Sequence, residues 1–207
     1  NCYLFASLYF CKKKMNYSLY AESTPNPDVM KFVANKMLVQ ENIEVLSINE
    51  SKNYPIAKAL FSFPFVKSVF LSSNYIAIRK SKDVEWENIA IQLRSFISEF
   101  LNNADQKDEI ILKTTEKKEK KDEINKKKFN DEEEEISEII NQYIKPAVES
   151  DGGSITLESF KMGIVKLNLS GACSGCPSAS LTLKQGIETL LKDKLGDKIK
   201  DVIATES

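Results

Sequence analysis

The sequence predicts an α+β protein made of two small α/β domains joined by a charged linker. Two observations carry this prediction: short alternating apolar segments accompany helical stripes in each half, and a run of mixed charge separates the halves. A chain of 207 residues with 42% apolar content is long enough to bury two small cores. We expect a leading segment over 1–14, domains over 15–103 and 132–207, and the linker over 104–131.

The leading segment, residues 1–14, does not match the rest of the chain. An apolar run is followed by Lys12, Lys13 and Lys14, whereas a signal peptide carries its positive charges before the apolar run. The run is also too short to span a bilayer. We interpret it as spurious or disordered sequence ahead of a start at Met15, with the tail of a truncated membrane anchor as the alternative.

The first domain is predicted to contain strands over 17–21 and 30–39, which alternate apolar and polar residues. Pro55 suits the first turn of a short helix that stops before Pro64. A hairpin is expected next, over 66–71 and 75–79. A final helix follows, with apolar residues at three- and four-residue spacing: Trp86, Ile89, Ala90, Leu93, Phe96, Ile97, Phe100 and Leu101.

The linker over 104–131 mixes lysines with acidic residues and contains no glycine or proline. Such a segment cannot bury enough apolar surface to offset the entropy of ordering it, so we expect it to be flexible or partly helical. Its acidic residues cancel its lysines, which argues against nucleic-acid binding. The whole chain has 29 basic and 30 acidic residues, and this net charge of −1 gives no field that favours nucleic acid or an anionic membrane.

The second domain is predicted to follow the order α-β-β-α-β. Acidic residues over 132–135 suit a helix N-terminus. Pro146 is expected to kink or tighten the last turn, and Asp151-Gly152-Gly153 to end the helix, because glycine readily adopts the left-handed conformation. Three further elements complete the order. A hairpin is expected over 155–160 and 164–169, a helix from Pro177, and a short strand over 199–204.

Two thiols three positions apart lie in the segment Gly171-Ala172-Cys173-Ser174-Gly175-Cys176-Pro177-Ser178. The segment follows a strand and precedes a helix, whose positive end stabilises thiolate, the form that binds metals and attacks disulfides. The chain has no histidine, which excludes imidazole ligands and histidine bases. Cys173 and Cys176 are therefore the candidate metal ligands and cluster-binding residues, and Gly171, Gly175 and Pro177 are expected to shape the loop.

Three kinds of chemistry and one structural role are compatible with this motif. A dithiol redox site is the first, although a helix and a hairpin precede the motif instead of a βαβ approach. A structural zinc site needs four ligands, and this domain offers two. An iron–sulfur cluster normally takes four thiolates, which two chains supply if each donates Cys173 and Cys176 across a two-fold axis. The structural role is that of two small buried hydrophobic residues.

Both halves of the chain resemble the Nfu proteins. Over about 136–204 the sequence resembles the NifU C-terminal domain, through Asp151-Gly152-Gly153, the segment 171–178, Leu181-Thr182-Leu183-Lys184 and Gly186-Ile187-Glu188. Over about 17–101 it is similar to the Nfu N-terminal domain, through Ser23-Thr24-Pro25-Asn26-Pro27, Met30-Lys31-Phe32, Ala57-Lys58-Ala59-Leu60-Phe61 and Val66-Lys67-Ser68-Val69-Phe70.

This resemblance implies an iron–sulfur cluster carrier rather than an enzyme. Members of the family bind a [4Fe–4S] cluster between subunits through the paired cysteines, which fall on Cys173 and Cys176, and pass it to apo-proteins. Four thiolates also suit a [2Fe–2S] cluster. The implied partners are a second copy of the chain, a cluster-donating scaffold and apo iron–sulfur client proteins, with no role for nucleic acid or membranes.

Two further expectations complete the prediction. No cysteine lies between Met15 and Ala172, so the chain should not build clusters as full-length NifU scaffolds do. Without an export signal we expect a reducing, bacterial-type cytoplasm, where thiols stay free. The alternative function is a thiol–disulfide oxidoreductase that uses Cys173 as its nucleophile.

Overall fold

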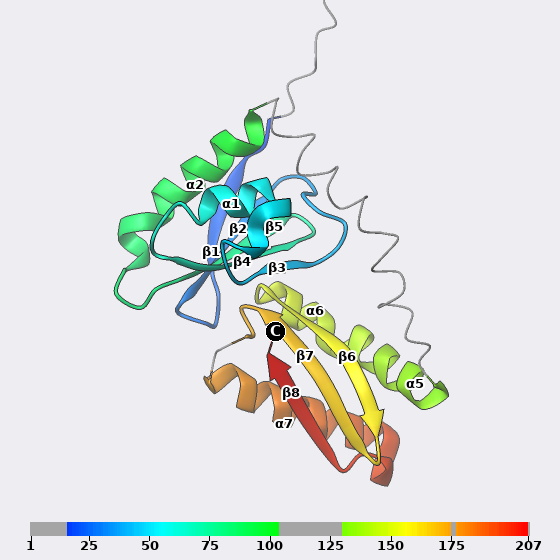
Figure 1. The fold of residues 1–207 in the computed structure, drawn as a ribbon. Coiled ribbons are helices and arrows are strands. Elements are labelled where there is room, and N and C mark those ends of the chain that lie inside the picture. Colours follow the sequence, from blue (N-terminus) through cyan, green and yellow to red (C-terminus); the bar gives the residue numbers. More distant parts are fainter. Residues whose placement is uncertain (1–15, 104–129, 175–176, 207) are drawn as a thin grey trace, which may run out of the picture.

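The computed structural model describes residues 16–103, 130–174 and 177–206, which form two α/β domains (Figure 1). The predicted α+β class is confirmed. The leader expected over 1–14 and nearly all of the linker expected over 104–131 lie outside the described residues. None of the helices formed by the described residues is both long and apolar enough to span a bilayer.

The N-terminal domain is a five-stranded antiparallel sheet in the order β1-β2-β5-β4-β3. Its strands are β1 (Leu19–Ser23), β2 (Val29–Ala34), β3 (Ile43–Val45), β4 (Val66–Ser72) and β5 (Tyr75–Lys80). Its helices α1 (Pro55–Leu60) and α2 (Trp86–Asn102) cover one face of the sheet (Figure 1), and a 3₁₀ turn (Glu50–Asn53) precedes α1.

The core of this domain lies between the helices and the inner face of the sheet. Alternation along β2 and β5 places Phe32, Ile76 and Ile78 on that face, where they are fully buried. The predicted apolar stripe of α2 packs against them through Leu93 and Ile97. The helices predicted from Pro55 and Trp86 and the hairpin formed by β4 and β5 are thus confirmed.

Two features of the sheet differ from the prediction. The strand expected over 30–39 ends at Ala34, because the chain turns there and the backbone N–H groups of Leu38 and Val39 donate to the Ser73 carbonyl. The edge strand β3 was not predicted. Three residues are too few to show a periodic pattern, so only pairing with β4 defines it.

The C-terminal domain is a three-stranded sheet in the order β6-β7-β8. Strands β6 (Gly153–Lys161) and β7 (Ile164–Gly171) form an antiparallel hairpin, and β8 (Asp201–Glu206) runs parallel to β7. The helical elements are α5 (Asp131–Ile139), a π turn (Ile140–Ile144), α6 (Lys145–Ser150), α7 (Pro177–Leu195) and a 3₁₀ turn (Gly196–Lys198). The predicted order α-β-β-α-β is confirmed.

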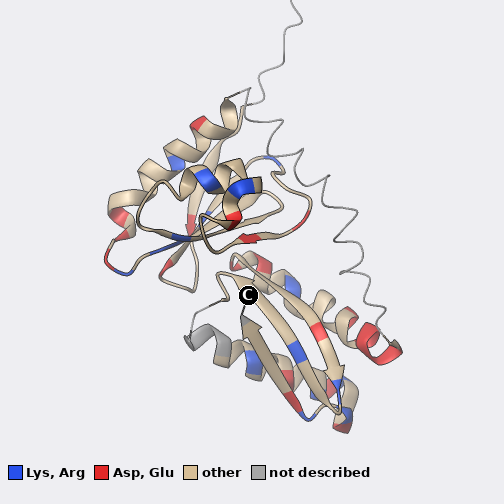
Figure 2. Ribbon diagram, viewed as in Figure 1, with Lys and Arg blue, Asp and Glu red and all other residues tan. Residues whose placement is uncertain are grey.

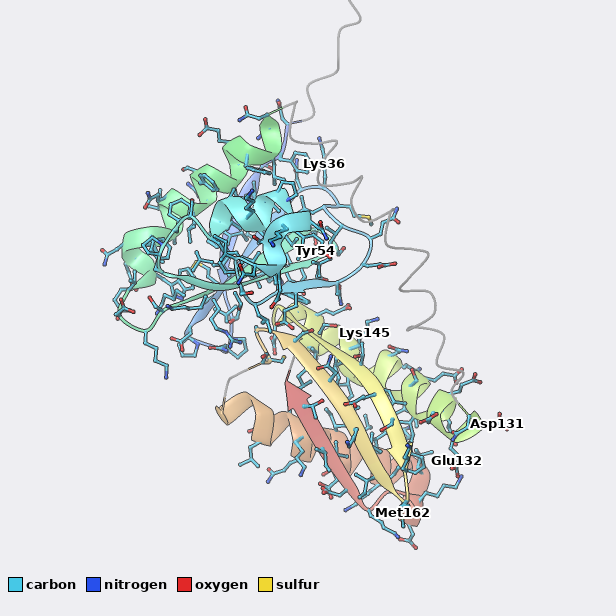
Figure 3. The ribbon with its side chains drawn as sticks, viewed as in Figure 1. Lys36, Tyr54, Asp131, Glu132, Lys145 and Met162 are labelled. Atoms are coloured by element: carbon cyan, nitrogen blue, oxygen red, sulfur yellow. The ribbon has the colours of Figure 1, made fainter. Side chains whose placement is uncertain are left out.

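Helix α5 begins with a capping box. The Asn130 side chain accepts a hydrogen bond from the Glu133 N–H at 2.8 Å, and the Glu133 carboxylate accepts one from the Asn130 N–H at 3.2 Å. Acidic residues gather on this first turn (Figure 2), Asp131 and Glu132 among them (Figure 3), next to the positive end of the helix dipole. Glu133 also accepts from the Phe160 N–H at 3.0 Å, which ties the helix start to β6.

The turn before Pro146 is widened rather than tightened. Proline cannot donate the backbone bond of a regular turn, and the chain accommodates it with the π turn over Ile140–Ile144. The helix ends where predicted, because Gly152 has a φ of 83°, in the left-handed region.

Leu167 of β7 is fully buried in the C-terminal core. We expect Leu167→Ala to lower the unfolding free energy of this domain by about 2 to 5 kcal/mol, because the lost contacts leave a cavity. Leu181→Ala is the matched control, since Leu181 is 59% exposed on α7 and its truncation should change stability by less than about 0.5 kcal/mol. If urea unfolding showed the same loss of unfolding free energy in both variants, this placement of the core would be contradicted.

Candidate metal-binding loop

The thiol loop, which we define as residues 171–178, connects β7 to α7. Strand β7 ends at Gly171, and α7 begins at Pro177, the residue after Cys176 in the sequence. Because β8 runs parallel to β7, the loop lies at the strand–helix junction of a β–α–β unit. The helix and hairpin that precede the motif in the sequence argue against a dithiol redox site, which expects a βαβ unit. The β–α–β position of the loop removes that objection.

Cys173 is buried, with 7% of its surface exposed, and belongs to the core of the C-terminal domain. A Cβ atom added to Gly153 would lie 2.5 Å from the Cys173 sulfur, so no side chain fits at position 153 while the sulfur stays there. Gly153 is therefore a residue of this site. The sequence predicts it only as part of the helix end. The available signal was a second glycine directly after Gly152, because a single glycine is enough to end a helix.

The other predicted loop residues are placed as follows. Gly171 has a φ of 67°, and a Cβ there would lie 2.7 Å from the Gly152 carbonyl oxygen, so this position requires glycine. Pro177 is the first residue of α7. Gly175 and Cys176 lie outside the described residues. Within the part of the chain that is described, no three His, Cys, Asp or Glu side chains gather as a metal site.

The N-terminal domain covers the thiol loop with the outer face of its sheet, opposite α1 and α2 (Figure 1). Ala172 is 3% exposed and inserts among residues of that face: Val29, Val33, Phe70, Tyr75 and Ala77. The Phe70 ring lies so close to Gly171 that a Cβ there would approach it to 2.8 Å. The domain contact thus places a second constraint on Gly171.

Polar groups of the same face, and Asn26 in the connection between β1 and β2, bind the backbone of the loop. The Arg79 guanidinium donates to the carbonyls of Gly171, at 3.2 Å, and Ser174. The Asn26 amide donates to the Ala172 carbonyl at 3.0 Å. Glu44 accepts a hydrogen bond from the Gly171 N–H at 2.9 Å. The N-terminal domain therefore recognises the main chain on both sides of Cys173.

A second set of contacts holds the start of β6, on which the Cys173 sulfur rests. The Tyr75 hydroxyl donates to the Gly153 carbonyl at 3.2 Å, and the Asn42 amide donates to the Ser154 hydroxyl at 2.8 Å. Burial raises the pKa of Tyr75 to about 12, and the nearby Glu149 and Cys173 charges add to the rise, against a hydrogen bond with Ser72 that lowers it. The phenol is therefore a proton donor throughout the neutral range.

Two family models match the chain, one in each domain. Residues 19–104 match "Scaffold protein Nfu/NifU N terminal", and residues 136–203 match "NifU-like domain". The chain belongs to the Nfu/NifU-like family. The resemblance noted in the sequence is thus confirmed for both halves.

Several curated proteins are similar to this Nfu/NifU-like chain. "NifU-like protein 4, mitochondrial" of Arabidopsis thaliana is 31% identical over 84% of the chain and 61% of its own length. "NFU1 iron-sulfur cluster scaffold homolog, mitochondrial" of Drosophila willistoni is 30% identical over 90% of the chain and 63% of its own length. The chain thus spans about three fifths of the relatives it matches. A solved NifU-like protein from Saccharomyces cerevisiae, 22% identical, overlays 41% of this chain and 78% of its own with a TM-score of 0.38.

The contact between Gly153 and the Cys173 sulfur can be tested by a glycine pair. We expect Gly153→Ala to lower the unfolding free energy by about 1 to 3 kcal/mol, because the added methyl group displaces the sulfur or the strand. Gly186→Ala is the control: nothing lies within 4 Å of its Cβ position on α7, so this change should raise stability by up to about 1 kcal/mol. Thermal unfolding that ranks the two variants in the opposite order would contradict the packing.

The raised pKa of Tyr75 makes stability depend on alkaline pH. The folded state holds this proton more tightly than the unfolded chain, whose tyrosines ionise near 10.0, so the stability from Tyr75 is complete below that pH and is lost as the pH rises towards about 12. We expect wild type to lose about 1 to 3 kcal/mol more than Tyr75→Phe between these pH values. Parallel alkaline losses in urea unfolding would show that Tyr75 is not buried.

Proposed function

We propose that this chain is a carrier of iron–sulfur clusters, which binds a cluster as cargo and passes it to apo-proteins. The observation that carries the proposal is a pair of cysteines, Cys173 and Cys176, at the β7–α7 junction of a NifU-like domain. The relative from Drosophila willistoni is named as an iron-sulfur cluster scaffold homolog, which supports the same assignment.

The number of thiols determines how the cluster would be held. A cluster takes four thiolates, and the C-terminal domain supplies Cys173 and Cys176 alone. We infer that two copies of the chain donate two thiolates each across a two-fold axis, so that the cluster bridges a homodimer. We propose a [4Fe–4S] cluster, and a [2Fe–2S] cluster would take the same ligands.

This arrangement suits delivery rather than turnover chemistry. A cluster held at the contact between two chains is released when they separate, and client apo-proteins can then supply competing thiolates. The proposed partners are accordingly a donor scaffold, a second copy of this chain and apo iron–sulfur proteins. On this proposal the chain is not an enzyme, and Gly171, Gly175 and Pro177 shape the loop that presents the thiolates.

A thiol–disulfide oxidoreductase is the second candidate, favoured by the β–α–β position of the thiol loop. Its nucleophile would be Cys173, whose sulfur is packed on Gly153 in the domain core. Attack on a disulfide requires an accessible thiolate, as cluster binding does, so this burial does not separate the two candidates. We rank the carrier first because the C-terminal domain matches the NifU-like family model and a relative is named as an iron-sulfur cluster scaffold homolog.

The proposal needs only a compartment that keeps thiols reduced. The cytoplasmic location expected from the sequence stays a prediction, whereas the relatives from Arabidopsis thaliana and Drosophila willistoni are mitochondrial by name.

Anaerobic reconstitution with iron and sulfide tests the carrier. We expect a brown protein with about four irons per dimer for a [4Fe–4S] cluster, and loss of the colour in Cys173→Ser. Cys11→Ser, outside both domains, should take up as much iron as wild type. Iron uptake that survives in Cys173→Ser would show that the ligand assignment is wrong, and a colourless protein that reduces insulin disulfides would favour the oxidoreductase.

A further inference from the structure

The part of the thiol loop whose side chains the structure describes, Gly171 to Ser174, is inaccessible. All four residues are buried, and Ser174 is only 5% exposed. Ala172 lies within the apolar patch of the N-terminal sheet, and side chains of that domain donate hydrogen bonds to the carbonyls of Gly171, Ala172 and Ser174. A second copy of the chain cannot bring its own thiol loop against Cys173 while this contact persists.

We propose that the outer face of the N-terminal sheet is an intramolecular cap for the thiol loop, which must leave the loop before two chains can share a cluster. The cap consists of Asn26 in the β1–β2 connection and of Glu44, Phe70, Tyr75 and Arg79 on that face, which contact the loop or the adjacent start of β6. This inference rests on the proposed function, because it concerns access to the thiols that would bind the cluster.

The cap is built by the alternation of the strands. Side chains on one face of a strand recur every second residue, so Tyr75 and Arg79 of β5 share the outer face, and the paired strands β3 and β4 add Glu44 and Phe70 to it. The face carries an apolar patch, and beside it lie hydrogen-bond donors and an acceptor that pair with the carbonyl and N–H groups of the loop backbone. A sheet face that served only as solvent-exposed surface would not need this match.

Several features make the cap separable. Its hydrogen bonds go to polar groups that water can satisfy after release, and interfaces between domains of one chain resemble transient ones. The boundary also contains a cleft of about 790 Å³, lined by residues of both domains that include Asn42, Ser72 and Lys145. Lys145 lies at the start of α6, on the side of the C-terminal domain that faces the sheet (Figure 3). The Arg79 Nε atom is buried with no hydrogen-bond partner among the described residues, so the docked state is not optimal.

The cap would link cluster loading to domain separation. A cluster that binds only the uncapped form shifts the population towards it, and the apparent affinity for the cluster falls in proportion to the fraction that is uncapped. In the apo form the cap would shield Cys173 from disulfides and oxidants. The N-terminal domain would then regulate the thiol loop through its own sheet.

The test compares two charge reversals in the full chain. Cys2, Cys11 and Cys176 are replaced by serine, so that Cys173 is the sole thiol, and its alkylation by iodoacetamide is followed by mass. We expect Arg79→Glu to accelerate alkylation about tenfold, because a carboxylate replaces the donor to two loop carbonyls. Arg94→Glu is the control, an identical charge change at an exposed position of α2, away from the loop, and should leave the rate unchanged.

Tyr75→Phe keeps the ring in the patch and removes the hydroxyl with its hydrogen bonds to Gly153 and Ser72, so it should give a smaller acceleration even if Arg79→Glu fails to fold. Equal alkylation rates in wild type, Tyr75→Phe and Arg79→Glu would overturn the cap. Reconstitution of the chain with its cysteines intact separates the two proposals: faster alkylation in a protein that never binds a cluster would support the cap and contradict the carrier. The opposite result is an Arg79→Glu protein that binds a cluster but whose apo form is alkylated at the wild-type rate. It would support the carrier and contradict the cap.

Discussion

The packing of the Cys173 sulfur on Gly153 is the constraint around which this structure is arranged. The sulfur occupies the space that a side chain at the start of β6 would need, so the end of β7 and the start of β6 are fixed against each other. Gly152 ends the preceding helix and its carbonyl accepts from the Ala172 N–H at 3.1 Å, which holds the loop on the same strand pair. One thiol of the motif is thereby positioned by the core of the domain.

A buried thiol on a carrier creates a conflict between protection and delivery. A thiolate must be accessible to receive a cluster, whereas a free cysteine is safest from oxidation when covered. A cap made by the other domain of the same chain supplies part of this cover and can leave without unfolding the loop, whereas the packing of the Cys173 sulfur on Gly153 stays. The far tip of the β6–β7 hairpin, where Met162 lies exposed, is left uncovered (Figure 3). Among the described residues, the N-terminal domain contacts the end of the hairpin that carries Cys173.

Much of the fold could be predicted from the sequence because its elements are long enough to show a period. The stripe of α2 and the two hairpins are examples. The domain contact could not be predicted, because the pattern of a strand shows that a face is apolar and does not show which surface covers it. One signal was present: adjacent residues such as Phe32 and Val33, or Ile76 and Ala77, are apolar on opposite faces of the sheet. Strands with apolar residues on both faces are covered on both faces, and α1 and α2 cover only one face of this sheet.

Native mass spectrometry of the cluster-loaded protein under anaerobic conditions tests most directly whether two chains share one cluster. We expect the mass of two chains plus four irons and four sulfides for a [4Fe–4S] cluster, and the apo protein to return to a single chain when the cluster is chelated. A single chain that retains a complete cluster would contradict the account, because Cys173 and Cys176 alone cannot supply four thiolates.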